Sequence, residues 1–450
     1  LWGDYVHVRK TLAHSVTYLW RVQFHSVSEI IVLLYEYFML SGDRAFAESA
    51  YDVCRQRWSE LFAAMDSRGL IPNIGYGCDD PAQLKQAGSR QYMPDGTAWI
   101  YHGARAMENL ALHFGDAGTA ANARMAADRI HAQYRALFYD EPVGYLASSI
   151  DAETLRKIPV YQNPATMAMI GTHGDTLLGE LVKPLADFQK RELAHPAGRS
   201  AVPYWCIADE MWKSCIMLQH AGHEMRTLRY AGEFEELARM WGVYEGLFDR
   251  CKLQIETINL CGMPGDPTGQ RADWQAFGSA AQYDVILRSV FGLELDYRAI
   301  SYTPCALDVE ARIAQLRHGT SRWTVEITGA GAWVDSFSVD GIPLRATVQV
   351  PAGYFDAQSH TLHIARSARP PETPYLLRTP GAGATVAAMD NGALRISLEG
   401  YGRIPVWIAA PSCPRNCDVN GQKTDVVWFD ALGKGYVEVL CRGEALVCIG

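Results

Sequence analysis

The most constraining feature of this chain is a repeated junction, in which one helical segment ends at glycine and the next begins at aspartate. It occurs at Gly42-Asp43, Gly115-Asp116 and Gly174-Asp175, with Gly222-His223 as a weaker fourth instance. Glycine supplies the left-handed residue that closes a helix, and aspartate accepts backbone N–H groups at the start of the following helix. Each junction therefore predicts a tight helix hairpin.

The helices on the two sides of these junctions differ in composition. The helix before a junction is rich in aromatic and apolar residues, whereas the helix after it is amphipathic and charged. The apolar helices are expected at 30–40, 97–114 and 207–218, and the amphipathic ones at 44–65, 118–138 and 224–248. This alternation predicts concentric inner and outer rings of helices.

The connections between hairpins are also informative. Each turn from an inner to an outer helix is short, whereas each return connection is long and rich in Pro, Gly and aromatic residues. Four long connections recur in register, at 66–96, 139–164, 194–206 and 251–275. Long irregular loops within a compact domain are usually functional. We therefore expect the functional site at the end of the ring where these connections lie.

The helix count predicts a mainly α fold, an (α/α)6 toroid that is incomplete in this chain. Five inner helices can be counted, the last at 276–291, and six outer ones if 5–19 is outer. A closed ring of six hairpins needs one more inner helix. The chain opens at Leu1 with neither methionine nor a signal-peptide pattern, so we expect the missing helix, and an additional N-terminal segment or domain, upstream.

After Leu295 the pattern changes to short alternating runs separated by turns such as Asp340-Gly341, which indicates β-strands. A Pro-rich segment at 367–374 divides this region. The expected domains are an (α/α)6-barrel catalytic domain at 1–296, a β-sandwich at 297–370 and a small C-terminal β domain at 371–450.

Composition excludes several classes of function. The net charge of -9 and the lack of a basic run argue against a nucleic-acid partner. The longest apolar run, 30–40, is interrupted by Glu36 and falls short of the roughly 20 residues that a membrane span needs. The 11 cysteines are scattered, and Cys413 and Cys417 form a lone pair without a nearby histidine, so we expect neither a metal nor another cofactor. Scattered free thiols favour a reducing, cytoplasmic location.

Two segments within the long connections resemble a known family. Gly77-Cys78-Asp79-Asp80-Pro81 resembles the general-acid segment of the processing α-glucosidases, trehalases and mannosylglycerate hydrolases, which are six-hairpin inverting glycosidases. Glu256-Thr257-Ile258-Asn259, followed by Asp266-Pro267-Thr268-Gly269 and Trp274, resembles their Glu-x-Tyr-Asn…Thr-Gly…Trp segment. The resemblance implies that Asp79 is the general acid and Glu256 the general base. Such enzymes hold the two carboxyl groups roughly 6.5–9.5 Å apart, with a water between them.

The chain departs from the family pattern at three positions. The family's arginine after the acid segment is replaced by Gln83 or is absent, its tyrosine is Ile258, and Cys78 stands where a large apolar residue is expected. Asp95 is therefore kept as a rival for the general acid.

Each candidate carboxylate also has a structural interpretation. Asp79 precedes Asp80-Pro81 and fits an ordinary turn, and Asp95 fits the cap of a helix that begins at Thr97. Asp209 and Glu210 lie at the start of another inner helix and fit its dipole. Glu256 is harder to explain in this way, because it lies in an apolar stretch where an unpaired carboxylate is costly.

Aromatic side chains gather in the same connections, and aromatic rings pack against the C–H faces of sugars. The substrate-binding candidates are Tyr76, Trp99, Tyr204, Trp205, Asp209, Trp212 and Trp274. Any one of these aromatic residues is also typical of a protein core.

The resemblance implies an inverting, exo-acting glycoside hydrolase with a carbohydrate substrate, a small α-linked saccharide or glycoside. Three alternatives remain open. A relative of the α-L-rhamnosidases or disaccharide phosphorylases would share the toroid, and a phosphorylase would depend on phosphate. A lyase acting on uronate sugars would use a tyrosine or histidine base. A non-catalytic carbohydrate-binding toroid would not depend on Glu256.

Overall fold

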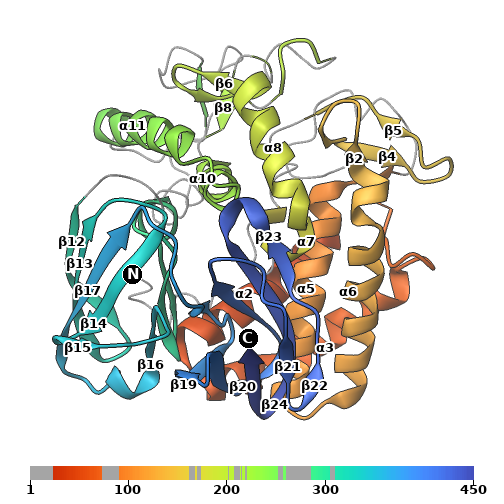
Figure 1. Ribbon diagram of the computed structural model, residues 1–450. Coiled ribbons are helices and arrows are strands. Elements are labelled where there is room, and N and C mark those ends of the chain that lie inside the picture. Colours follow the sequence, from red (N-terminus) through yellow and green to blue (C-terminus); the bar gives the residue numbers. More distant parts are fainter. Residues whose placement is uncertain are drawn as a thin grey trace. The chain divides into compact units, whose positions relative to one another are not determined.

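The computed structural model describes residues 24–72, 91–161, 168–169, 174–200, 202–206, 213, 215–217, 220–251, 257–259, 285–304 and 310–450. A helical part is followed by a part built of sheets, as expected (Figure 1). The chain divides into two compact units. The first consists of Leu1–Tyr35, Ala45–Glu108 and Ala117–Val285, and the second of Glu36–Arg44, Asn109–Asp116 and Ile286–Gly450.

The α-helices of the described residues are α2 (Phe24–Ser41), α3 (Arg44–Ala64), α5 (Pro94–His113), α6 (Ala117–Phe138), α7 (Gly174–Leu178), α8 (Val182–Phe188), α10 (Ala221–Tyr230) and α11 (Phe234–Cys251). Shorter 3-10 or π turns are η3 (Gly179–Leu181), η4 (Gln189–Leu193), η6 (Val285–Val290), η7 (Ala352–Tyr354) and η8 (Asp430–Leu432).

The predicted contrast between apolar and amphipathic helices is confirmed for the first two hairpins. The amphipathic helix α3 buries one face, formed by Ala47, Tyr51, Cys54, Trp58 and Leu61. The buried residues of α6 recur in the same way, every three or four positions. In α5, by contrast, no residue is exposed, and its Gly103 lies so close to α2 that an added Cβ would stand 2.9 Å from the Ser28 Cβ.

The first two glycine-aspartate junctions are the predicted turns. Gly42 has φ +64° and Gly115 has φ +79°, both in the left-handed region that favours glycine. The Gly42 N–H donates to the Phe38 carbonyl at 2.8 Å and the Asp116 N–H to the Ala111 carbonyl at 2.8 Å, so the last carbonyls of α2 and α5 gain partners. Both turns belong to the second unit, where His113 packs 4.9 Å from Phe38 and 5.0 Å from Tyr401 between ring centroids.

The other two predicted junctions differ from expectation. Gly174 is the first residue of α7, and the residues just before it lie outside the described part. Gly222 lies inside α10, so the prediction of a turn at Gly222-His223 is wrong. The chain instead turns at Gly232, with φ +73°, between α10 and α11. Glycine adopts both left-handed and right-handed backbone conformations, so a glycine in the sequence does not by itself predict a turn.

The helix expected at 207–218 does not reach its predicted end. Cys215–Met217 forms strand β8, which pairs antiparallel with β9 (Thr257–Asn259). A partner from a distant part of the chain overrides the local pattern.

The short strands of the first unit lie in its connections: β1 (Gln91–Tyr92), β2 (Tyr139–Asp140), β3 (Tyr145–Leu146), β4 (Ser149–Asp151), β5 (Lys157–Ile158), β6 (Ala194–His195) and β7 (Gly198–Arg199), together with β8 and β9.

The second unit holds three sheets. The first sheet, in the order β10-β11-β16, is built from β10 (Leu293–Asp296), β11 (Ala299–Tyr302) and β16 (Gln349–Pro351). The second sheet, in the order β12-β13-β17-β14-β15, is built from β12 (Ala311–His318), β13 (Ser321–Gly329), β14 (Trp333–Val339), β15 (Ile342–Pro343) and β17 (Ser359–Ser367). In it β13 and β17 run parallel, and the predicted turn at Asp340-Gly341 joins β14 to β15 with both residues at positive φ.

The third sheet has seven strands, in which β18, β20, β24, β21 and β22 follow one another while β19 pairs with β20 and β23 with β24. Its strands are β18 (Tyr375–Arg378), β19 (Ala382–Asp390), β20 (Ala393–Ala409), β21 (Cys417–Val419), β22 (Gln422–Lys423), β23 (Val427–Phe429) and β24 (Lys434–Ile449). β20 and β24 pair from Leu394↔Ile449 to Ala409↔Lys434.

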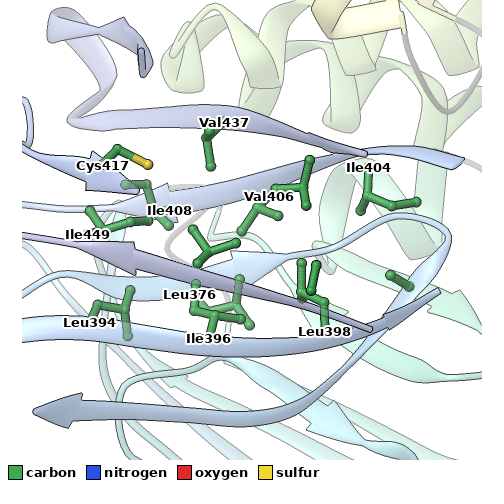
Figure 2. Packing of buried hydrophobic residues seen from close by; sticks show 14 of the residues in the cluster. Leu376, Leu394, Ile396, Leu398, Ile404, Val406, Ile408, Cys417, Val437 and Ile449 are labelled. Carbon is green, nitrogen blue, oxygen red and sulfur yellow. The ribbon is translucent and has the colours of Figure 1, made fainter. Parts of the chain in front are cut away.

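Figure 2 shows the core of the third sheet, with apolar side chains from β18, β20, β21 and β24 gathered together. Leu394, Ile396, Ile404 and Val447 are all 0% exposed. Burying each such side chain stabilises the fold by about 1.5–3 kcal/mol. Within the same unit, a Cβ added to Gly402 would stand 1.8 Å from the Asn109 side-chain oxygen, so only glycine fits there.

Among the described residues, no helix has the length and apolarity that crossing a membrane requires. No group of three or more His, Cys, Asp or Glu side chains in the same part of the chain is placed to hold a metal ion.

Candidate functional site

The long connections of the helical unit are joined to one another by short strands. In the first connection, Tyr92 pairs with Ile150 and Gln91 with Asp151 of the second connection. Within the second connection, Ser149 pairs in turn with Ile158. The connections on either side of the α5–α6 hairpin are therefore in direct backbone contact.

The chain of contacts continues into the third and fourth connections. The Tyr161 N–H lies 3.4 Å from the Cys206 sulfur, which ties the second connection to the third. Ser200 forms a bridge with Ile216 of β8, and Met217 pairs with Thr257 of β9. The described segments of the four long connections therefore lie next to one another, and their place at one end of a ring stays a prediction.

Asp95 lies in the first turn of α5, three residues after β1. α5 begins at Pro94, a residue suited to a first helical position, so Asp95 does not cap a helix that starts at Thr97. Asp95 is buried, with 2% of its surface exposed. Burial, and then the negative charge of Asp95, hold the pKa of Tyr134 well above its usual value. The Tyr134 hydroxyl donates to the Pro94 carbonyl at 3.0 Å.

Trp99 lies four residues after Asp95, and His102 lies three residues after Trp99. This spacing places all three on one face of α5. The His102 Nε2 lies 2.8 Å from the Ala168 carbonyl, and because a carbonyl only accepts, Nε2 carries the proton. Burial is the main cause that lowers the pKa of His102 to about 4, so the ring is neutral near pH 7. Its Nδ1 is then a bare acceptor.

This face of α5 presents a donor and an acceptor to which no described residue is hydrogen-bonded. The indole N–H of Trp99 and the Nδ1 of His102 are buried and have no hydrogen-bond partner in the part of the chain that the structure describes. The two rings meet edge to face with centroids 6.3 Å apart. Buried polar groups without a partner are costly, so such groups commonly bind water or a ligand.

A second polar group of the helical unit lies on α10, whose residues Ala221–Arg229 are all buried. Arg226 donates to the Met169 carbonyl at 2.6 Å, next to the carbonyl that His102 contacts. His223 is 3% exposed and packs 5.0 Å from His220 between ring centroids. Burial, and then His220 and Arg226, lower the pKa of His223 well below its usual value, so this ring is also neutral.

Two arginines bind Glu236 of the neighbouring helix α11, and a tyrosine of α11 binds α10. The fully buried Arg199 of β7 donates to Glu236 of α11 at 2.9 Å, and Arg239 contacts both oxygens of the same carboxylate at 2.7 Å. The Tyr244 hydroxyl donates to Glu224 of α10. Pairing of this kind is what allows charges to be buried.

The sequence does not single out α10 as part of a site. His220, His223 and three charged residues fall within the ten positions 220–229. Such a density of polar residues in a buried helix is the sequence signal that could have identified this group. Because Gly222-His223 resembles the other turns, the sequence pattern assigns these residues to a solvated outer helix.

Tyr204 and Trp205 lie at the surface of the third connection, 78% and 53% exposed. The Trp205 indole N–H donates to Glu192 at 2.7 Å, and its ring packs 5.7 Å from the buried Tyr161 between centroids. The Lys213 ammonium lies 5.7 Å from the centre of the Tyr204 ring.

The remaining predicted site residues lie outside the described part of the chain. They are Tyr76, Asp79, Asp209, Trp212, Glu256 and Trp274. Glu256 immediately precedes β9, whose Thr257 pairs with Met217.

Comparison with known proteins gave matches only among solved structures. No family model and no curated protein matches the chain. Similar structures include a sialidase (14% identity, TM-score 0.47) and a rhamnosidase from Klebsiella oxytoca with rhamnose bound (14% identity, TM-score 0.42). Another is a GH63 mannosylglycerate hydrolase from Thermus thermophilus in complex with glucose (16% identity, TM-score 0.41).

The similarity is partial in each case. It covers 61%, 60% and 58% of this chain, and 27%, 47% and 73% of the sialidase, the rhamnosidase and the mannosylglycerate hydrolase. The similar structures include a mannosylglycerate hydrolase, one of the group that the Gly77–Pro81 segment resembles. At these identities and TM-scores, the similarities by themselves assign neither a fold nor an activity to this chain.

Proposed function

We propose that the protein is a carbohydrate-active enzyme, an inverting glycoside hydrolase that removes a terminal unit from a small α-linked saccharide or glycoside. Its catalytic domain is an (α/α)6 toroid at 1–296, with β modules at 297–370 and 371–450. Asp79 is the general acid and Glu256 the general base, as the motifs of the two connections imply.

The observation that carries this proposal is the joined layer of long connections at one end of the helical unit. Four connections that the sequence marks as candidate site segments contact one another through β1–β4–β5, Cys206 and β8–β9. Side chains with the chemistry of a sugar site lie on or directly beside this layer. Sugar sites combine aromatic faces for C–H groups with a few polar groups for hydroxyls.

Trp99 and His102 supply the polar part of such a site. A sugar hydroxyl both donates and accepts, and the unused indole N–H and the neutral Nδ1 offer one donor and one acceptor on a single helix face. This pair therefore supports a neutral, hydroxyl-bearing ligand.

In the proposed reaction, Asp79 gives a proton to the glycosidic oxygen as the bond to the anomeric carbon breaks. Glu256 takes a proton from a water that attacks the same carbon from the opposite face, which inverts its configuration. Asp95 is the alternative acid, since it stands in the same layer, three residues after β1.

Three single variants test these roles. Asp79→Asn and Glu256→Gln should each lower turnover of p-nitrophenyl α-glycosides or α-linked disaccharides by at least about a hundredfold, because general acid or base catalysis contributes roughly 10²–10⁴-fold. Their thermal midpoints should stay near that of the parent protein. Asp95→Asn is the matched control, and a large loss in this variant with normal turnover in Asp79→Asn would transfer the acid role to Asp95.

The stereochemistry of the first product tests the mechanism. Proton NMR taken within the first minutes should show the anomer opposite to that of the substrate, and retention would rule the mechanism out. Turnover that requires phosphate would identify a phosphorylase, and a product with new ultraviolet absorption would identify a lyase.

A further inference from the structure

Tyr204 and Trp205 are the only aromatic residues among the large apolar side chains that the structure describes as strongly exposed. They are adjacent in the chain and lie in the third long connection, beside Cys206, whose sulfur contacts the second connection. Exposed aromatic pairs are uncommon on a soluble surface because burial would be more favourable, and they often mark binding sites.

Trp205 is fixed at both its edge and its face. Its indole N–H donates to Glu192 Oε2 at 2.7 Å, and its ring packs against Tyr161 at 5.7 Å between centroids, tilted by 50°. Tyr161 is itself anchored, since it is 3% exposed and its hydroxyl donates to Asp140. A side chain that is held in one orientation while half its surface faces solvent has already lost the rotamer freedom that binding would otherwise remove.

Polar groups flank both rings. Arg191 donates to the second Glu192 oxygen at 2.6 Å, and the hydrogen bond from Trp205, followed by that from Arg191, lowers the pKa of Glu192. The carboxylate beside the indole is therefore ionised and accepts hydrogen bonds at neutral pH. At the neighbouring ring, the Lys213 ammonium lies 5.7 Å from the centre of Tyr204 and can donate.

We propose that Tyr204 and Trp205 form a platform that binds the sugar units behind the cleaved terminal residue, so that the preferred substrate is an oligosaccharide chain longer than a disaccharide. Each ring offers one apolar face of the size of a sugar ring, and two adjacent rings accommodate more than one unit. Glu192 and Lys213 stand where hydroxyls at the edges of those units can bond. The proposal rests on the proposed glycosidase function and extends it from a small saccharide to a chain.

The test uses gluco- and manno-oligosaccharides, α-linked, of two and of six units. Tyr204→Ala and Trp205→Ala are compared with Met125→Ala, a matched control in which a similarly solvent-facing apolar residue of α6 is truncated. Binding is measured by calorimetry in the full chain carrying Glu256→Gln, so that affinity is read without turnover. Hydrolysis of the same sugars is measured in the parent protein.

Each platform variant should weaken binding of the six-unit sugars by about threefold to tenfold, the range for loss of one aromatic contact, and leave two-unit binding within twofold. Trp205→Phe keeps an aromatic ring but loses the hydrogen bond to Glu192. Its affinity for the six-unit sugars should therefore lie between that of the chain with Trp205 and that of Trp205→Ala. Because Tyr204 is 78% exposed, Tyr204→Ala should fold even if Trp205→Ala does not.

The outcomes separate the two proposals. If the chain carrying Glu256→Gln binds the six-unit sugars equally well with and without Tyr204→Ala or Trp205→Phe, the platform is overturned, even if the parent hydrolyses disaccharides. Failure of all the sugars to bind the chain carrying Glu256→Gln alone would overturn it as well. Length-dependent binding that the variants reduce, with no hydrolysis by the parent, would support the platform and reject the proposed reaction.

Discussion

At the scale of single residues, the helical unit contains buried polar atoms that no described residue binds. The Trp99 indole N–H and the His102 Nδ1 are buried but have no protein partner within the described chain. Folding alone gains nothing from them, because a buried donor or acceptor without a partner costs about 1–3 kcal/mol. Changes at these two residues should therefore affect activity more than stability.

Trp99→Phe tests this expectation. Phenylalanine removes the unsatisfied N–H, which favours stability, but it also loses the contacts of the second indole ring, so the thermal midpoint should change little. The same change should lower kcat/KM by roughly 2–10-fold, the value of one neutral hydrogen bond. A lower midpoint with normal kcat/KM would show that the indole N–H is structural. Tyr134→Phe, which removes a hydroxyl bonded to the Pro94 carbonyl, is the control in which stability should fall.

At the scale of elements, local sequence predicted what local forces determine. The turns at Gly42 and Gly115, the one-sided burial of α3 and α6 and the hairpin turn at Asp340-Gly341 all followed from nearby residues. The errors have non-local causes. Cys215–Met217 is a strand because Thr257–Asn259 pairs with it, and no pattern within 207–218 contains that partner.

Two glycines allow the effect of a left-handed backbone conformation on stability to be separated from the effect of packing. Gly115 has φ +79° in a turn, whereas Gly246 lies within the helix α11, and an added Cβ would meet nothing within 4 Å at either position. Gly115→Ala should destabilise the protein by about 1 kcal/mol because alanine is strained in the left-handed region. Gly246→Ala should stabilise it by roughly 0.5–1 kcal/mol. Urea unfolding of the two variants checks both signs, and destabilisation by Gly246→Ala would show unseen crowding.

At the scale of the whole molecule, the location of the functional site stays a prediction, and the structure shows where the described candidate residues lie. The sequence placed it in the long connections, and Asp95, Trp99, Tyr204 and Trp205 do lie in or next to the layer that these connections form. It could not distinguish buried from exposed aromatic residues, since burial depends on distant segments. His220 and His223 were missed for the same reason: helix α10 is buried by contacts with α8, α11 and Met169, which no local pattern records.

The second unit should respond to pH through one histidine that joins two acidic turns. His360 Nδ1 lies 2.7 Å from Asp340 and its Nε2 lies 2.9 Å from Asp356, while its ring packs against Trp323 and Tyr354. The Thr361 and Gln358 N–H groups also donate to these carboxylates. A neutral imidazole has a single N–H, so only the protonated ring can donate to both carboxylates.

The sign of the pH dependence follows from the pKa shifts. Burial alone would lower the pKa of His360, but its hydrogen bonds to Asp340 and Asp356 raise it above its usual value. The stabilisation by His360 is therefore complete below about pH 6.5, the pKa of an unfolded histidine. It is lost as the pH rises through the pKa of His360 in the folded protein. The pKa of each aspartate is lowered despite the opposing effect of burial at Asp340, so the aspartate contribution is lost on acidification below about pH 4. The contribution of the trio is therefore largest between these limits. His360→Gln should destabilise the full chain more at pH 5.5 than at pH 8.5 in urea unfolding. Other titrating groups, including His318 on the neighbouring β12, are present in both the parent and His360→Gln, so their effects cancel when the two free energies of unfolding are subtracted. An equal loss of stability at the two pH values would mean that His360 is neutral in the folded sheet.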